Sequence, residues 1–463
     1  MLSNDVILEI FDFYVDEDMD NEDPELYEKE TTEAWITLAH VCRRWRSVVF
    51  RSPRRLNLRL LCTPLTPTRD TLDIWPPLPL IIRVESEPPR VEDVIAALEH
   101  NECVCQIDLI DLTSSQWEDV TDSAAVCRPF PELTHLQLAV LGPKAILPDS
   151  FLDGTAPRLR SLYLVDVLFP KLLKLLLSTT HLVDLSLDGI GYIPPEAMAI
   201  SLSALTSLEY LCLYFRSPRP RPETRRPPPP TRSILPSLTE IRFKGASEYL
   251  EVILARIDAP RLDKLDIAFF NQIVFNTPQL FQFISRRPTL SAPEKGYIEF
   301  SPRAIIVKFS SQTSDYGVAS VHIPCSVSEW QISSLEQVCT SSFPPFSTLE
   351  DLHIFEDQLY SLRWQDDVEN AVWLDLLRSF VAVKNLYISE DFVPRIAPAL
   401  QELVGGRTTE VLPNLDNIFL GGFQSPGPLH EGIEKFIIAR RLASHPVAVS
   451  RWDRERHWDF DDL

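Results

Sequence analysis

The sequence predicts an α/β fold in which parallel strands build a long sheet, helices cover its outer face, and a short all-α segment precedes both. Three observations predict this fold. A short apolar pattern recurs along most of the chain, helix-compatible segments lie between its copies, and two aromatic-rich amphipathic segments come before the first copy. Since strands that alternate with helices pair in parallel, we expect all the helices on one face of the sheet.

The first N-terminal segment, "LSNDVILEIFDFYV", predicts an amphipathic helix. Ser3 or Asn4 can cap its start, and Asp5 suits the first helical turn. The apolar side of this helix is expected to consist of Val6, Ile7, Ile10, Phe11 and Tyr14.

The second N-terminal segment, residues 35–49, has apolar side chains at spacings of three and four, which predicts one continuous helix. The residues on this stripe are Trp35, Leu38, Cys42, Trp45 and Val49. Together the two helices carry more apolar surface than a unit of about fifty residues buries alone. Some of that surface must therefore pack on the repeats, on a partner, or on both.

The recurring pattern places apolar residues at positions i, i+3 and i+5. Its nine clear copies begin at Leu133, Leu159, Leu182, Leu208, Leu238, Leu262, Leu349, Val383 and Leu415. A weaker copy begins at Val104, and from there to Leu262 the intervals are 23 to 30 residues. Each copy predicts a short strand whose alternate residues point inward, preceded by an apolar residue that closes the turn.

Other parts of the chain depart from this repeat. Residues 271–345 lack a clear copy apart from the weak "GVASVHI", although "YIEFSPRAIIVKFSS" predicts β-strands. Residues 216–233 hold seven prolines and six arginines, which predicts an exposed loop between repeats. A nuclear-import or SH3-type segment is the alternative, because proline pre-orders an extended helix.

The predicted domain organisation has four parts. Residues 1–55 form a helical domain that contains an acidic loop at residues 16–33, and residues 56–89 supply a linker and capping strands. Residues 90–425 hold the repeats, and residues 426–463 begin with an amphipathic helix that caps the last repeat and end in an acidic tail.

Composition narrows the class of protein. The formal net charge of −22 argues against a general binder of nucleic acid or anionic membranes, which needs a basic face. Eight cysteines in 463 residues, with no Cys-x-x-Cys, do not resemble a disulfide framework. The N-terminus lacks the basic region of a signal peptide, and no apolar run approaches the roughly 18–20 residues of a membrane span. We therefore expect a cytoplasmic and/or nuclear protein with neither a membrane nor a nucleic-acid partner.

No motif in the sequence points to catalysis. A Gly-rich phosphate loop, His-Glu-x-x-His and Gly-x-Ser-x-Gly are all missing. Arginines near Cys42 could lower its pKa, but its place on a helical stripe favours a packing role. His100 stands near Cys103 and Cys105 without the spacing of a metal site. We expect no enzyme activity, no cofactor and no metal.

From about residue 90 to residue 425, the chain resembles a leucine-rich-repeat solenoid of an irregular kind. It departs from that family three residues after the last strand leucine, where an Asn or Cys is usual. The residues at this position are Leu141, Val167, Ile190, Arg216 and Ala246. The parallel sheet is therefore expected without an asparagine ladder at this position.

The two N-terminal segments resemble an F-box, the helical motif that docks the Skp-type adaptor of cullin–RING ubiquitin ligases. The similarity lies in "LSNDVILEIFDF", with Asp5 in the place of the family's Glu, and in "LAHVCRRWRSV". Two departures are Ser3 in place of Pro and the acidic loop that lengthens the connection. The resemblance implies that the adaptor contacts Leu2, Ile7, Ile10, Phe11, Leu38, Val41, Cys42 and Trp45.

An F-box followed by leucine-rich repeats is the arrangement of many substrate receptors, including a large fungal set that this chain resembles. The resemblance implies a non-catalytic subunit of a Skp–cullin–F-box ubiquitin ligase, bound to the adaptor and through it to a cullin. An unidentified protein target would bind the repeats. The alternative is a leucine-rich-repeat interaction protein without a ligase, in which the N-terminal segment is only a cap.

Target binding is expected on the side of the strands that faces away from the core. Residues two and four positions after the first apolar residue of each copy lie on that side. Tyrosine and arginine are frequent interface anchors. The candidates for target binding are Tyr163, Tyr210, Arg242, His353 and Tyr387.

Overall fold

A computed structural model describes most of the repeats and both N-terminal helical segments. The described residues are 2–16, 37–52, 60–62, 72, 78–84, 91–140, 142, 144–216, 232–270, 276–311, 314–325, 328–341, 348–356, 369–404, 407–421 and 430–452. Except for their ends, the acidic loop 16–33 and the Pro/Arg loop 216–233 lie outside these residues. The chain divides into two compact units, Met1–Gly191 and Tyr192–Leu463.

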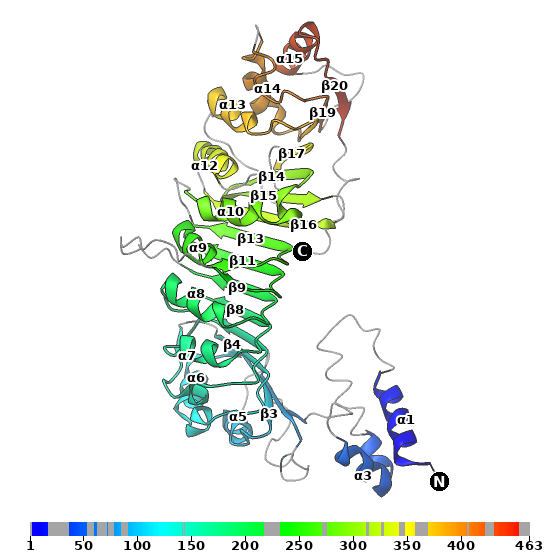
Figure 1. Cartoon of the computed structure of the whole chain (residues 1–463), viewed down its shortest axis with the longest axis vertical. Coiled ribbons are helices and arrows are strands. Elements are labelled where there is room, and N and C mark those ends of the chain that lie inside the picture. The colour runs from blue at the N-terminus through cyan, green and yellow to red at the C-terminus, as the bar shows by residue number, and fades with distance from the viewer. Residues whose placement is uncertain are drawn as a thin grey trace. The chain divides into compact units, whose positions relative to one another are not determined.

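Unit 1 begins with helical segments and continues as strand–helix repeats (Figure 1). Its helices are α1 (Asn4–Asp16), α3 (Arg43–Arg51), α5 (Val91–Leu98), α6 (Ser114–Asp122), η1 (Ala124–Cys127), η2 (Phe151–Gly154) and α7 (Leu172–Ser178). Its strands are β1 (Leu60–Cys62), β2 (Leu80–Val84), β3 (Val104–Leu112), β4 (His135–Val140), β5 (Ala145–Ile146), β6 (Ser161–Val165), β7 (Val167–Leu168) and β8 (Asp184–Asp188).

The main sheet of unit 1 is parallel, as the sequence predicts. Its strand order is β1-β2-β3-β4-β6-β8, and β5 pairs with β7 in a separate two-stranded ladder. Equivalent positions of the repeat pair across this sheet, so that Leu136, Leu162 and Leu185 stand in register. All three are at most 1% exposed. The recurring leucines thus form one continuous core beneath the sheet.

Unit 2 continues the same alternation. Its helices are α8 (Pro195–Ser203), α9 (Ser247–Leu254), α10 (Pro278–Ser285), α11 (Pro288–Ser291), α12 (Ser328–Ser341), α13 (Asn370–Arg378), α14 (Val393–Gln401) and α15 (Glu431–Leu442). Its strands are β9 (Tyr210–Tyr214), β10 (Ser233–Ile234), β11 (Glu240–Gly245), β12 (Ile257–Asp258), β13 (Lys264–Phe269), β14 (Lys295–Ser301), β15 (Ala304–Ser311), β16 (Ser314–Pro324), β17 (Asp351–Glu356), β18 (Asn385–Ile388), β19 (Asn417–Leu420) and β20 (Ala448–Arg451).

An antiparallel meander interrupts the parallel sheet of unit 2. The strand order is β9-β11-β13-β16-β15-β14-β17-β18-β19-β20, while β10 and β12 form a separate ladder. After β13 the chain reaches β14, returns through antiparallel β15 and places β16 beside β13. Helix α12 then leads to β17, which pairs in parallel with β14. The strands of this meander lie between Lys295 and Pro324, within residues 271–345, where the sequence has no clear repeat.

In unit 2, helices α9, α10, α12 and α13 all project to the same side of their strands (Figure 1). We use the name "sheet face" for the opposite, helix-free side of the strands. The C-terminal segment differs from the prediction in one respect. After α15 the chain forms strand β20, which pairs in parallel with β19, so the expected cap includes a further strand.

Candidate interaction surfaces

The prediction of one continuous helix over residues 35–49 is wrong. Residues 37–41 are helical, Cys42 is extended with φ −159° and ψ 168°, and α3 begins at Arg43. The Cys42 thiol sulfur accepts the Trp45 N–H at 3.4 Å and thereby caps α3. The interruption removes Cys42 from the helical stripe on which the sequence places it.

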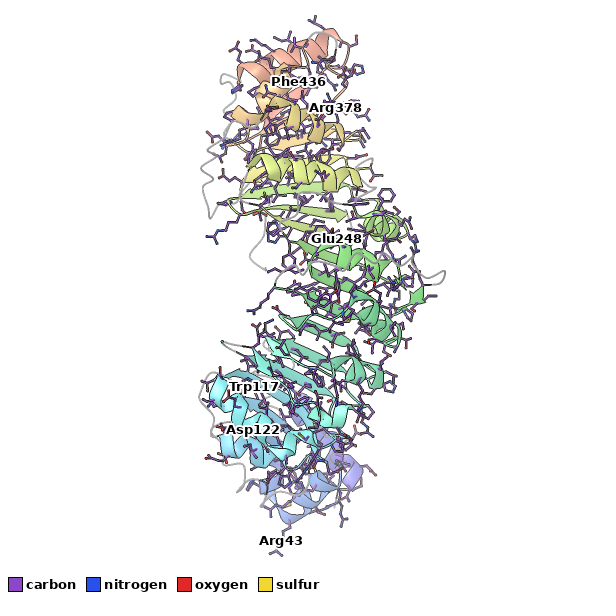
Figure 2. The ribbon with its side chains drawn as sticks, turned by 90° about the vertical axis from the view of Figure 1, so that its left-hand side faces the viewer. Arg43, Trp117, Asp122, Glu248, Arg378 and Phe436 are labelled. Atoms are coloured by element: carbon purple, nitrogen blue, oxygen red, sulfur yellow. The ribbon has the colours of Figure 1, made fainter. Side chains whose placement is uncertain are left out.

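Helix α1 begins as predicted. Ser3 Oγ accepts the Val6 N–H at 3.4 Å, and the Ser3 carbonyl accepts the Ile7 N–H at 3.1 Å. From α3, Arg44 donates hydrogen bonds to the Leu2 carbonyl and, at 3.2 Å, to Asn4 Oδ1. The Arg44 side chain thus connects α3 to the start of α1. Figure 2 labels Arg43, the first residue of α3.

The N-terminal helix pair has its own small interior. Phe11 is 0% exposed, and its ring lies 4.9 Å from the ring of Trp45 in an edge-to-face arrangement. Ile7 and Leu38 are buried as well, whereas Trp45 is half-buried. Four of the eight residues assigned to adaptor docking therefore support the packing of the pair.

The other four residues, Leu2, Ile10, Val41 and Cys42, are exposed. Val6 and Ile10 are four residues apart on α1 and 43% and 44% exposed, and Leu2, two residues before the helix begins, is 56% exposed. Val41 is 56% exposed at the end of the preceding helical turn. We call these four aliphatic residues the N-terminal aliphatic patch. Val6 was not among the candidate site residues, although its spacing from Leu2 and Ile10 could have indicated it.

An aromatic ladder lies on the sheet face of unit 2. The strand register aligns Tyr297, His353, Tyr387 and Phe419 on β14, β17, β18 and β19. Successive ring centroids are 4.7, 4.0 and 4.4 Å apart, and each pair is stacked. His353 lies inside this stack and is only 6% exposed, so a partner has little access to it. Tyr387 is half-buried beside it.

Trp452 covers one side of the ladder. Its ring lies 5.6 Å from His353 and 5.7 Å from Tyr387, and the residue is 4% exposed. The backbone N–H of Trp452 donates to the Leu420 carbonyl and thus continues the pairing of β20 with β19. Its buried indole Nε1 has no hydrogen-bond acceptor among the described residues.

A row of polar side chains runs beside the aromatic ladder. Asn385 Nδ2 donates to Asp351 Oδ1 at 2.7 Å, and Asn417 Nδ2 donates to Asn385 Oδ1 at 2.8 Å. These residues occupy equivalent positions on β17, β18 and β19. The amide–carboxylate row fixes the register of the three strands and thereby holds the aromatic rings in line.

The candidates Tyr210 and Arg242 contact each other on the sheet face of unit 2. The Arg242 guanidinium lies 5.7 Å from the centre of the Tyr210 ring, and its Nε donates to Glu240 Oε1 at 2.7 Å. Burial raises the pKa of Tyr210, so its hydroxyl is a neutral hydrogen-bond donor at physiological pH. Next to this cluster, Lys244 and Lys264 are exposed.

The remaining candidate, Tyr163, belongs to unit 1 and is 37% exposed on β6. On the neighbouring part of that sheet face, Gln106 Nε2 donates to Asp108 Oδ2 at 2.7 Å, and Arg83 Nε lies 3.4 Å from the same oxygen. Asp108 is 5% exposed and Gln106 is 8% exposed. This buried polar group links β2 to β3, and Tyr163 is exposed two strands farther along the sheet.

Two further features are absent from the described part of the chain. Within it, no three His, Cys, Asp or Glu side chains are grouped as metal ligands. None of its helices is both long and apolar enough to span a bilayer.

Comparisons with known proteins add little to this description. No family model matches the sequence, and no curated protein matches it. Among solved structures, the chain is similar to the leucine-rich repeat-containing protein LegL7 from Legionella pneumophila, at 12% identity and a TM-score of 0.27. That match covers 84% of this chain and 98% of the other. The assignment of the fold rests on the strand register and the buried leucines described above.

Proposed function

We propose that this chain is the non-catalytic substrate-recognition subunit of a Skp–cullin–F-box type ubiquitin ligase. The N-terminal helix pair would dock the Skp-type adaptor, which links the chain to a cullin, and the repeats would bind a protein target. The observation that supports docking is the N-terminal aliphatic patch of Leu2, Val6, Ile10 and Val41. These residues remain about half exposed on a helix pair in which Ile7, Phe11 and Leu38 are buried.

An amphipathic helix commonly binds by placing a row of apolar side chains in a partner's groove. Val6 and Ile10 have the spacing of such a row on α1, and Leu2 lies just before the helix. Covering a half-exposed aliphatic side chain contributes on the order of 1 kcal/mol. The patch therefore suits the docking of a partner that presents an apolar groove.

Ser3, which replaces the proline of the F-box pattern, is compatible with this proposal. Proline commonly begins helices because its fixed φ suits the first turn. Here the Ser3 hydroxyl accepts the Val6 N–H and supplies the start of α1 in another way. The departure from the motif thus leaves α1 and its exposed row in place.

In this role the chain contributes proximity rather than chemistry. Holding the target and the adaptor on one chain raises the effective concentration of target lysines near the charged conjugating enzyme. Ubiquitin transfer would be carried out by other subunits.

The test is to change Val6 and Ile10 together to serine and to measure the affinity of the purified full-length chain for a Skp-type adaptor. Losing two aliphatic contacts should weaken binding by about 2 kcal/mol, roughly thirty-fold in Kd. A matched control is the same change at Ile438 and Leu442, which are 51% and 82% exposed and also four residues apart on α15. The proposal fails if the unmodified chain does not bind the adaptor, or if both double variants lose affinity equally.

The alternative function is an interaction or scaffold protein with no ligase. Its supporting observation is that Ile7, Phe11 and Leu38 are buried within the helix pair, as a simple end cap requires. Comparing the full chain with a version that lacks residues 1–50 separates the two functions. Equal recovery of the adaptor by both would favour the scaffold.

A further inference from the structure

The charges on the sheet face of unit 2 differ from those of the chain as a whole. The chain has 66 acidic and 44 basic residues. The register of β11, β13, β15, β14 and β17 places comparable numbers of both signs on this face. The basic residues are Arg242, Lys244, Lys264, Lys308 and Lys295, and the acidic ones are Glu240, Asp266, Glu299 and Asp351.

All four of those carboxylates already have partners within the face. Glu240 accepts from Arg242 at 2.7 Å, and Asp266 accepts from Ser320. Glu299 lies 3.6 Å from the Lys308 ammonium, and Asp351 accepts from Asn385 at 2.7 Å. Ion pairs therefore neutralise Glu240 and Glu299, while Asp266 and Asp351 keep their negative charge and accept hydrogen bonds from neutral donors.

Two lysines on the same face are in a different situation. Lys244 on β11 and Lys264 on β13 are exposed, and neither forms an ion pair with any described residue. They stand on adjacent strands: Lys264 is opposite Glu240 in the register, and Lys244 lies two residues beyond Arg242 on β11. This end of the face thus offers two uncompensated positive charges to a partner.

The aromatic ladder also offers groups that attract an anion, namely ring edges and a tyrosine hydroxyl. Stacking occupies the faces of its rings, so a partner meets ring edges, which carry the positive part of the aromatic quadrupole. Burial, reinforced by Asp351 and Tyr297, raises the pKa of Tyr387, whose hydroxyl therefore remains a donor. Ring edges and hydroxyl donors both favour carboxylate groups.

We propose that the sheet face of unit 2, from Lys244 and Lys264 to the ladder of Tyr297, His353, Tyr387 and Phe419, binds an extended acidic segment of a partner protein. This proposal rests on the function proposed above, because it specifies the chemical class of the target that the repeats would bind.

The length of the segment follows from the strand order. From β13 to β18 the sheet takes five steps, through β16, β15, β14 and β17. At about 4.8 Å for each step this is about 24 Å, which an extended peptide covers with about seven residues. A segment of that length can place one carboxylate near Lys264 and another near the Tyr387 hydroxyl.

The net charge of −22 does not prevent such binding. At physiological ionic strength, exposed charges are largely screened beyond about 8 Å, so the nearby lysines dominate for a docked peptide. Nucleic acid fits this face less well, because its phosphates require a continuous basic surface. Here four carboxylates lie between the basic residues.

The test is to select decamers from a random display library on the intact full-length chain, with no adaptor present. The decamers recovered should be enriched in Asp and Glu. Changing Lys244 and Lys264 together to Glu should lower the affinity of the most enriched decamer at least about tenfold, because attraction becomes repulsion. Tyr387→Phe, which keeps the ring but removes the hydroxyl, should weaken it about threefold or more.

A control with the same change in charge is Lys171→Glu with Lys174→Glu, two exposed lysines at α7 in unit 1. This control should keep the affinity of the unmodified chain, and all variants should keep its melting temperature. Enrichment of basic or uncharged decamers, or full affinity in the Lys244/Lys264 double variant, would overturn the proposal. The selection does not involve the adaptor, so loss of adaptor binding alone would count only against the ligase function.

Discussion

Phe11→Ala should unfold the N-terminal helix pair while leaving the main melting transition of the repeats almost unchanged. Phe11 is 0% exposed, and its ring makes the edge-to-face contact with Trp45 that joins α1 to α3. Truncating a buried phenylalanine costs about 3–5 kcal/mol. A unit of about fifty residues rarely has that much stability to lose. The repeats have their own leucine core, so their melting should persist.

Hydrogen exchange is the measurement for this variant. Amide protection in α1 and α3 should fall to that of an unfolded segment, and adaptor affinity should be lost with it. Ile10→Ala is the matched control, because Ile10 lies on the same helix but is 44% exposed. The control should keep the protection of α1. Unchanged protection in Phe11→Ala, or a lowered melting temperature of the whole chain, would contradict the description of a separate helix-pair core.

The same measurements decide how Trp45 acts. The sequence suggests two roles for it, a docking hot spot or a core residue, and the structure places it half-buried against Phe11. Trp45→Ala should therefore reduce both the protection of α1 and the affinity for the adaptor. If affinity fell while protection stayed intact, Trp45 would be a direct contact of the partner.

Arg440→Leu should destabilise the C-terminal repeats by about 3 kcal/mol or more, because it leaves buried carbonyl groups without a donor. Arg440 is 1% exposed and donates to the carbonyls of Thr408, Pro413 and Leu415 at 3.2, 3.3 and 3.0 Å. Its guanidinium also lies 5.9 Å from the ring centre of Phe436, which Figure 2 labels on α15. Burial lowers the pKa of Arg440, and the hydrogen bonds compensate for that burial.

The neighbouring Arg441 provides the control for this variant. It lies on the same helix but is exposed, so Arg441→Leu should change stability by no more than about 0.5 kcal/mol. Thermal melting of both variants, with hydrogen exchange of α15, β19 and β20, measures the difference. Equal melting temperatures for the two leucine variants would show that the Arg440 hydrogen bonds contribute no net stability.

The sequence alone determined the repeating core. Leucines at i, i+3 and i+5 indicated strands, and the amphipathic segments between them indicated helices. The structure confirms this with Leu136, Leu162 and Leu185 in register and buried. Such features were predictable because the period of the apolar residues is local information. Parallel pairing then follows from the alternation of strands and helices.

At two places, local hydrogen bonding and helix packing gave a structure that differs from the one the apolar pattern predicts. The helical stripe through Cys42 looked continuous, but its thiol caps α3 and the backbone there is extended. On α1 the sequence placed Val6, Ile7, Ile10 and Phe11 on one apolar side. Only the packing of α3 decided that Ile7 and Phe11 are buried while Val6 and Ile10 remain exposed.

Strand order and register decided the rest. The sequence predicts strands over residues 297–311 and a weak repeat at 317–323, but only the hydrogen bonds between strands place β16 beside β13 and β14 beside β17. Tyr297, His353, Tyr387 and Phe419 come from four separate segments, and nothing in the sequence near any one of them points to the other three. They form a ladder because the pairing of β14, β17, β18 and β19 brings equivalent positions into line, where the strand spacing of about 4.8 Å lets neighbouring rings stack.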